Sequence, residues 1–227
     1  MVEYNTLEME PERRKRMTQR QQAALETRRK IVEAGFALVR SGGFAEASVE
    51  AITHTAGVAK GTFYVHFPTK EHLAAEICRE PYEKLSRDVM ASGGSLQRRI
   101  ARLFLGWAAI ADETGVECIR ELFRIMLSPT LAADIGLTLS ERDLSVVESL
   151  LRDAVASGEL RAETPVRSLA ENLFAQIRGL ATAWCMSPSG SRSLHAAAGR
   201  FLRNHLPALL APFLNDPENT AVRNPPG

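Results

Sequence analysis

Hydrophobic residues recur with the period of an α-helix along most of this chain. From Thr27 onward, Ile31, Ala34, Leu38 and Val39 are spaced so that they share one helix face. Apolar stripes of the same period follow over 96–111, 116–127, 139–156, 165–186 and 193–214. No segment alternates like a strand and no internal repeat is present, so the pattern predicts an all-α fold of about nine helices.

Turn residues divide the N-terminal part into short helices. The sequence Ser-Gly-Gly at 41–43 ends the first helix, because glycine tolerates the left-handed conformation beyond a helix C-terminus. Ser48 is a suitable N-cap for a second helix, which Gly57 ends. A third helix is predicted over 59–66, and a fourth begins at Lys70.

Two residues depart from good helix chemistry. Ala59, at the start of the third helix, has no side chain that could cap it, so about 1 kcal/mol of capping is missing. Pro81 falls inside the helix expected after Lys70, where it lacks an N–H group and clashes with the carbonyl of Ile77. We therefore expect a kink or a break at Pro81.

The short helices have the arrangement of a helix-turn-helix. Gly57 supplies the turn, and Phe63 and Phe67 lie four residues apart and pack inward with Ile52 and Val49. Five residues beside these phenylalanines are expected to point largely away from that core. They are Lys60, Gly61, Thr62, Tyr64 and His66. A helix of this size is about 12 Å long, comparable to the width of the DNA major groove.

The glycines and lysine at 57–61 do not form a nucleotide-binding loop. A P-loop has the order GxxxxGK[ST] after a buried strand, whereas Lys60 precedes Gly61 and follows a segment of helical pattern. GxGxxG, GxSxG and HExxH are absent, and the five histidines are dispersed. The sequence therefore argues against an enzyme, and an all-α enzyme is kept only as a less favoured alternative.

The stretch AGVAKGTFYVHFPTK at 56–70 carries the most specific pattern in the chain. With its flanks, from Thr27 to Ala75, it resembles the DNA-binding domain of the tetracycline-repressor (TetR) family. The resemblance implies that DNA is contacted by Ser48, Lys60, Gly61, Thr62, Tyr64, His66 and Lys70. Ser48 and Lys70 would bind phosphate, because hydroxyls, helix N-termini and ammonium groups suit anions.

The pattern and the resemblance together predict four parts. They are a flexible polar and basic tail over 1–24, a helix-turn-helix domain over 25–72, a ligand-binding and dimerisation domain over 73–214, and a disordered tail over 215–227. The cluster RRKR at 13–16 is either a solvated arm or an arm that touches the DNA backbone.

The last two helices are apolar on more than one side, so they must bury more than one side. A monomer core is one interpretation. The resemblance favours a four-helix interface between two copies of the chain, made of these two helices and their symmetry mates. The predicted interface residues are Leu169, Leu173, Ile177, Leu180, Phe201, Leu202 and Leu209.

The middle helices would then enclose an effector cavity lined by apolar side chains. The predicted ligand-binding residues are Phe104, Trp107, Phe123, Met126, Asn172, Gln176 and Trp184. For each aromatic residue, ordinary core packing is the alternative. Arg120 and Arg178 are further polar residues that either orient a ligand or are exposed. The sequence does not reveal the chemistry of the effector.

Composition narrows the class of protein. The chain is 45% hydrophobic and 24% charged, which is ordinary for a globular protein, and its net charge of +1 confines any nucleic-acid signal to a local surface. Three scattered cysteines and dispersed histidines predict reduced core thiols and no metal or other cofactor. The apolar run at 103–111 is too short to span a membrane, so we expect a cytoplasmic protein, nucleoid-associated when bound to DNA.

These observations predict a ligand-responsive, DNA-binding transcriptional regulator that acts as a homodimer. It would be a repressor that a small apolar or amphipathic effector releases from a near-palindromic operator. A transcriptional activator of the same fold is one alternative. A non-specific architectural DNA-binding protein is another, but residues 1–80 carry 12 basic against 11 acidic side chains, without the basic excess of that class.

Overall fold

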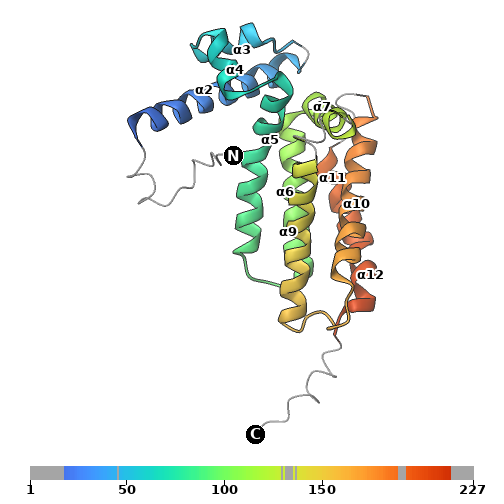
Figure 1. Ribbon diagram of the computed structural model, residues 1–227. Coiled ribbons are helices and arrows are strands. Elements are labelled where there is room, and N and C mark those ends of the chain that lie inside the picture. The colour runs from blue at the N-terminus through green and yellow to red at the C-terminus, as the bar shows by residue number, and fades with distance from the viewer. Residues whose placement is uncertain are drawn as a thin grey trace. The chain divides into compact units, whose positions relative to one another are not determined.

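The computed structural model describes residues 18–44, 46–128, 130, 135, 137–188 and 193–215. Within these ranges the chain forms ten α-helices and one short 3-10 helix (Figure 1). The only pairing of extended backbone found there is an isolated bridge between Leu160 and Leu214. The predicted all-α class is confirmed. Most of both predicted tails, 1–17 and 216–227, lies outside the described residues.

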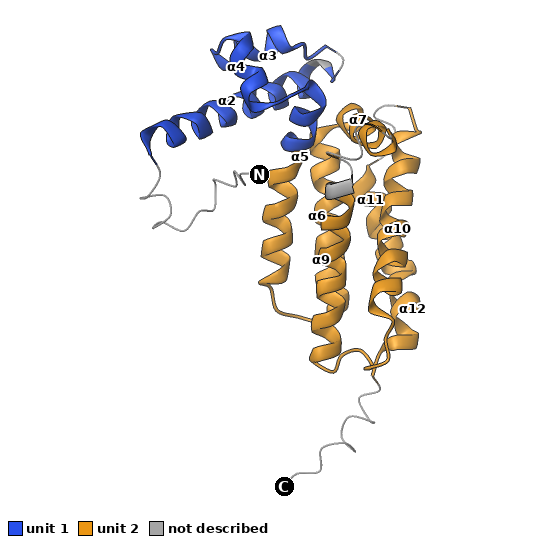
Figure 2. Cartoon of the chain, in the orientation of Figure 1, with its two compact units in different colours: residues 1–77 blue, residues 78–227 orange. Residues whose placement is uncertain are grey.

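The chain divides into two compact units, Met1–Ile77 and Cys78–Gly227 (Figure 2). Unit 1 contains α2 (Gln19–Gly42), α3 (Val49–Ala56), α4 (Lys60–His66) and the first turns of α5 (Lys70–Met90). The division between the units thus falls inside α5.

Helix α2 begins at Gln19, earlier than the apolar pattern suggested. Thr18 and Gln21 form a capping box, in which the Thr18 hydroxyl accepts from the Gln21 amide at 3.2 Å and the Gln21 side chain accepts from the Thr18 amide at 2.9 Å. The residues from Gln19 to Ala24, expected in a flexible tail, are therefore helical. A polar cap rather than an apolar face determines where this helix starts.

The core of unit 1 forms where α2, α3, α4 and α5 meet. Ile31, Ile52, Phe63 and Phe67 are fully buried there. Gly35 on α2 is needed for this packing, because a Cβ atom at that position would lie 2.8 Å from the Leu73 side chain of α5. This close approach fixes the start of α5 against α2.

Unit 2 is a bundle of long helices. It contains the rest of α5, α6 (Leu96–Thr114), α7 (Val116–Leu127), α9 (Leu137–Ala156), α10 (Val166–Cys185), α11 (Leu194–Asn204), α12 (Leu206–Leu210) and the 3-10 helix η2 (Ala211–Phe213). Helix α9 packs against α6 and α10, and α11 packs against α6. Figure 1 shows α6, α9 and α10 side by side. Fully buried side chains at their centre include Phe104, Leu150 and Leu151.

The sequence predicted a kink or a break of the helix at Pro81. The predicted break is wrong, because α5 is not interrupted there. The helix is continuous from Lys70 to Met90 with Pro81 inside it. Contacts on both sides of the proline hold the turns together. The side chains of Arg79 and Glu83 form an ion pair at 3.2 Å across it, and the Ser86 hydroxyl donates to the Tyr82 carbonyl at 2.8 Å.

The three cysteines are free thiols. Cys78 and Cys118 are buried, as expected of core residues, while Cys185 is half-buried. A hydrogen bond with Cys118, together with burial, raises the pKa of the Cys78 thiol. Burial also raises the pKa of Cys185, to about 11. Cys78 and Cys185 are therefore not reactive thiolates near neutral pH.

Candidate DNA-binding face and effector cavity

Helices α3 and α4 are joined by a tight turn. The hydroxyl of Ser48 accepts from the amide of Ala51 at 3.1 Å and caps α3, which confirms the predicted cap. Gly57 has a φ of 67° and ends α3 in the left-handed conformation, while the Val58 amide donates to the Thr53 carbonyl at 3.0 Å. The predicted turn of a helix-turn-helix is confirmed.

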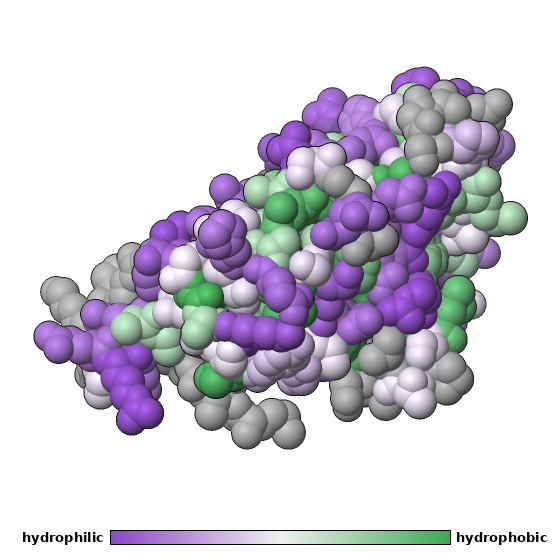
Figure 3. All heavy atoms as spheres, turned by 90° about the horizontal axis from the view of Figure 1, so that it is seen from above, coloured by the Kyte–Doolittle hydropathy of each residue, from purple (hydrophilic) through white to green (hydrophobic). Residues whose placement is uncertain are grey.

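Helix α4 has one anchored face and one outward face. Phe63 and Phe67 are fully buried, with ring centroids 5.7 Å apart. On the other side, Tyr64 is 49% and Val65 81% exposed, and Val65 was not singled out from the sequence. Of the other predicted contacts, Ser48, Lys60 and Gly61 are exposed and Thr62, His66 and Lys70 half-buried. The view from above in Figure 3 shows mainly hydrophilic residues, with apolar ones in separate patches.

The start of α4 lacks a side-chain cap at Ala59, as predicted. The Thr62 amide instead donates to the Ala59 carbonyl at 2.9 Å. Apart from its two chain neighbours and the backbone of its own helix, no described atom lies within 4 Å of where a Cβ of Gly61 would be. The absence of a side chain at Gly61 is therefore not required by packing within the protein, and it leaves the outer surface of α4 open to a close approach.

Arg28 on α2 fixes the end of α4, and the sequence analysis missed it. Its Nη1 donates to the His66 carbonyl at 2.8 Å, its Nη2 lies 3.1 Å from the Glu76 carboxylate, and its guanidinium stacks 4.2 Å from the Phe67 ring centroid. A cation at the last carbonyls of a helix stabilises its C-terminus. Arg28 lies on the polar side of α2, so apolar periodicity gave no signal for it.

Both predicted ammonium contacts already have partners within unit 1. Lys60 forms an ion pair with Glu50 of α3, which raises the pKa of Lys60 and lowers that of Glu50. Lys70 donates to the Phe44 carbonyl at 2.7 Å and lies over the Phe44 ring. An ammonium has three N–H donors, so each lysine keeps donors for a phosphate beside its partner within unit 1.

His66 is neutral at neutral pH. Burial, and after it the positive charge of Arg28, lowers the pKa of its imidazole. The ring therefore offers one donor and one acceptor nitrogen rather than a charge.

Residues 31–77 match the model of the bacterial regulatory proteins of the tetR family. Over these residues the chain therefore has the DNA-binding domain of the TetR family. It is 22% identical over 161 residues to the fatty acid metabolism regulator protein of Bacillus subtilis (strain 168), covering 69% of this chain and 82% of that protein. It is 26% identical over 158 residues to the HTH-type transcriptional repressor DhaR of Mycobacterium sp. (strain GP1), covering 67% of this chain and 79% of the relative.

Solved structures show the same fold. FadR from Bacillus subtilis in complex with stearoyl-CoA aligns with a TM-score of 0.61 at 21% identity, covering 77% of this chain and 95% of FadR. FadR from Bacillus halodurans aligns with a TM-score of 0.60 at 21% identity, covering 78% of this chain and 98% of FadR. Proteins of the TetR family are regulators that bind operator DNA as dimers and respond to small molecules. In the described ranges, no helix is both long and apolar enough to cross a membrane.

Unit 2 contains a partly open cavity of about 120 Å³. The lining comes from α5, α6, α7, α9, α10 and α11, and it is mostly apolar. Three of the predicted ligand-binding residues line it, namely Trp107, Phe123 and Met126.

The other predicted ligand-binding residues do not line this cavity. Phe104 is buried behind Trp107, with the two rings stacked at 5.5 Å. Asn172 is exposed, Gln176 lines a separate surface groove, and Trp184 is half-buried elsewhere on α10. Arg120 donates to the carbonyls of Cys185 and Ser187 and so holds the end of α10.

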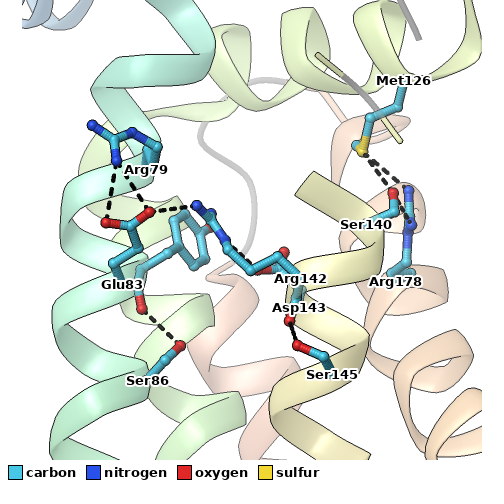
Figure 4. A network of polar contacts seen from close by, with 10 residues as sticks. Arg79, Glu83, Ser86, Met126, Ser140, Arg142, Asp143, Ser145 and Arg178 are labelled. Atoms are coloured by element: carbon cyan, nitrogen blue, oxygen red, sulfur yellow. Dashed lines mark hydrogen bonds and ion pairs between the residues drawn. The ribbon is translucent and has the colours of Figure 1, made fainter. Parts of the chain in front are cut away.

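One side of the cavity is polar (Figure 4). Arg79 and Arg142 both bind Glu83, across from Arg178 on α10. Burial raises the pKa of Asp143 to about 6, although the nearby Arg142 and Arg178 oppose that shift. These charged residues are far apart in the sequence, and only the packing of α5, α9 and α10 brings them to one wall.

The predicted interface residues fall into two groups. Five are buried within the single chain, and of these Ile177 lines the cavity: Leu169, Leu173, Ile177, Phe201 and Leu202. Leu180 and Leu209 are half-buried and, with Phe201, line a groove of about 570 Å³ along α10, α11 and α12. The apolar stripe of α10 that contains Leu169 and Leu173 faces the core of its own chain.

Proposed function

We propose that this protein is a repressor that holds its operator through α4 and releases it when a small molecule occupies the cavity of unit 2. The observation that carries the proposal is the two-faced α4, with buried Phe63 and Phe67 on one side and exposed Lys60 and Tyr64 on the other. Relatives named as transcriptional repressors support repression rather than activation.

We infer that DNA is bound by the polar groups on and around α4. The Ser48 hydroxyl and the Lys70 ammonium would bind phosphates, and Lys60, Gly61 and Thr62 would face the major groove. Tyr64 and the neutral His66 would reach phosphates or base edges. The exposure of Ser48, Lys60 and Tyr64 supports this assignment.

We further infer that two copies meet along the groove of α10, α11 and α12. A single α4 makes few contacts, and a twofold dimer doubles them on a near-palindromic operator. Leu180 and Leu209 support this surface, because they are only half-buried within one chain. Such a regulator works where the chromosome is, so we place it in the cytoplasm, nucleoid-associated when bound to DNA.

The effector acts by population shift. It binds better to the conformation whose recognition helices are wrongly spaced for successive major grooves, so operator affinity falls as it binds. The mostly apolar cavity supports a small apolar or amphipathic molecule. The stearoyl-CoA bound by FadR supports an effector with an acyl or comparable apolar group.

The proposal is tested by fluorescence anisotropy on the DNA upstream of the protein's own gene. We expect the protein to bind this DNA in a salt-sensitive way. An excess of unlabelled duplex with a scrambled sequence should not displace it. Tyr64→Ala should weaken binding by about tenfold without lowering the melting temperature, whereas Lys30→Ala, an exposed change on α2, should leave it unchanged. Equal affinity for scrambled DNA would favour the architectural alternative.

A further inference from the structure

The volume of the unit 2 cavity matches a compact molecule. Its volume of about 120 Å³ is near the ~150 Å³ of an engineered apolar cavity that binds one benzene. Trp107 and Phe174 form part of its wall and meet edge to face, with ring centroids 6.0 Å apart. The apolar part of a bound molecule is therefore about one ring or a short chain in size.

The polar wall carries more positive than negative charge. Arg79 and Arg142 both bind the single carboxylate of Glu83, at 3.2 and 2.6 Å. Asp143 lies 4.0 Å from Arg142. Three guanidinium groups line the cavity, because Arg178 joins the other two. Among the described residues, Arg178 is the one guanidinium of the three that forms no ion pair with a carboxylate.

Arg178 forms no ion pair, although the carboxylate of Asp143 is near enough to act on its charge. Its Nη1 donates to the Ser140 hydroxyl at 2.9 Å, its Nη2 contacts the Met126 sulfur at 3.1 Å, and its guanidinium lies 5.2 Å from the Phe174 ring centroid (Figure 4). None of these partners is an anion, and a thioether is a weak acceptor. A half-buried guanidinium that lacks a paired carboxylate is unfavourable, and a bound anion would relieve it.

We propose that the effector is a compact amphipathic carboxylate whose acid group binds Arg178 and whose apolar body lies against Trp107 and Phe174. This inference rests on the proposed function, since it names the molecule that the cavity takes. A carboxylate fits because its single negative charge matches the single positive charge of Arg178. Its two oxygens also match the fork of N–H groups of a guanidinium.

A phosphate or a coenzyme A thioester fits less well. A phosphate monoester carries about −1.5 to −2 charges, which exceeds the single positive charge of Arg178. The remaining cations of the wall, Arg79 and Arg142, are already bound to Glu83. No lysine lines the cavity among the described residues.

The first experiment needs no variant. Isothermal titration of the full-length protein compares benzoate, phenylacetate and hexanoate with the neutral amide of each acid, and with stearoyl-CoA. We expect at least one acid to bind about tenfold or more tightly than its own amide, because a charge-assisted bond is lost with the amide. The same acid should release the DNA upstream of the gene.

The second experiment locates the anion. Arg178→Gln should weaken binding of that acid by about tenfold or more while leaving the amide unchanged, and Arg178→Lys should restore part of the difference. Arg167→Gln is the matched control, because Arg167 lies on the same helix, pairs with Glu148 and Glu171 and does not line the cavity. Unchanged amide binding would show that the Gln variant is folded.

Three outcomes would overturn the inference. They are equal affinity for acid and amide, no binding by any acid, and release of DNA by stearoyl-CoA alone. In the last case the proposed function survives, because a ligand still releases the operator. If the protein binds no specific DNA, the proposed function fails, and the comparison of acids with amides still decides whether Arg178 binds a carboxylate.

Discussion

Lys60 and Glu50 show how a single ion pair can set DNA affinity. The pair is exposed, and such pairs contribute little to stability, so a phosphate can displace Glu50 from Lys60. In the proposed complex, the displaced carboxylate would remain beside the DNA backbone and repel it. Part of the attraction of Lys60 for DNA would then be offset by its neighbour on α3.

Replacing Glu50 with Gln should strengthen operator binding. The repulsion is lost while the shape is kept, so we expect the Kd to fall by about threefold to tenfold at low salt. Lys60→Ala should weaken binding and reduce the slope of log K against log salt by about 1. Anisotropy titrations over a range of salt concentrations measure both effects. Weaker binding by the Glu50→Gln variant would mean that the carboxylate orients Lys60 rather than masking it.

Asp143 gives unit 2 a pH-dependent stability. Its folded pKa of about 6 lies above the ordinary value of 3.8, so the folded state holds this proton more tightly than the unfolded state. The stabilisation is present below about pH 4 and is lost as pH rises through 6, and it amounts to at most about 3 kcal/mol.

Asp143→Asn should remove this dependence. Urea unfolding of unit 2 is followed by the fluorescence of Trp107 and Trp184, at pH 4.5 and at pH 8. Relative to the variant, the wild type should lose about 2 kcal/mol between these two pH values, because the unfolded carboxyl is already largely ionised at pH 4.5. Glu163→Gln, an exposed change in the same unit, should follow the wild type. If the free energy of unfolding changed equally with pH in the wild type and in Asp143→Asn, Asp143 would not be the source of the pH dependence.

At the scale of elements, α11 depends on a residue of another helix. Asp112 of α6 accepts from the Leu194 amide at 2.8 Å, from the His195 amide at 3.0 Å and from the Ser193 hydroxyl at 2.6 Å. A carboxylate at a helix N-terminus satisfies unpaired amides and suits the helix dipole.

Asp112→Ala should destabilise unit 2 by about 1 to 2 kcal/mol, because it leaves these amides without their acceptor. Ser193→Ala removes the local cap and one of the three bonds to Asp112 but leaves both amide bonds in place, so it should have a smaller effect. Glu113→Ala, next to Asp112 but exposed, is the control and should be neutral. Thermal unfolding monitored by circular dichroism measures all three. A neutral Asp112→Ala would show that water replaces the carboxylate.

Helix positions could be predicted from the sequence wherever one local rule determined them. The cap at Ser48, the turn at Gly57 and the missing cap at Ala59 each depend on one side chain. The start of α2 was predicted too late, because the Thr18 capping box lies in a stretch without apolar periodicity. Pro81 was predicted to kink or break α5, and the break was wrong because contacts across the neighbouring turns hold the helix.

At the scale of the whole molecule, operator binding should depend on pairing of two copies. Leu180→Arg places a charge in the groove of α10, α11 and α12, where we propose that a second copy packs. We expect a shift from dimer to monomer in sedimentation and a loss of about a hundredfold or more in DNA affinity, since each α4 then binds alone.

The control for this change is Leu127→Arg, which alters a leucine that is 80% exposed on α7, outside the groove. It should leave both the oligomeric state and the DNA affinity unchanged. A dimeric Leu180→Arg protein would place the interface elsewhere on unit 2.

The effector cavity could be predicted only in part, because it is made by packing rather than by a motif. Trp107, Phe123 and Met126 line it, and each carries the apolar signal of a middle helix. Its charged wall combines Arg79, Asp143 and Arg178, which no spacing in the sequence relates. The predicted interface residues could also be assigned only in part. An apolar stripe on a helix does not show whether it packs against the core of its own chain or against a second copy.

The tryptophan content of the chain has a practical consequence. The protein has two tryptophans, both lie in unit 2, and Trp107 forms part of the cavity wall. A molecule that enters the cavity touches a fluorophore, and it also raises the temperature at which unit 2 melts. The protein therefore contains its own optical reporter, and a compound library can be screened for effectors before any operator is known.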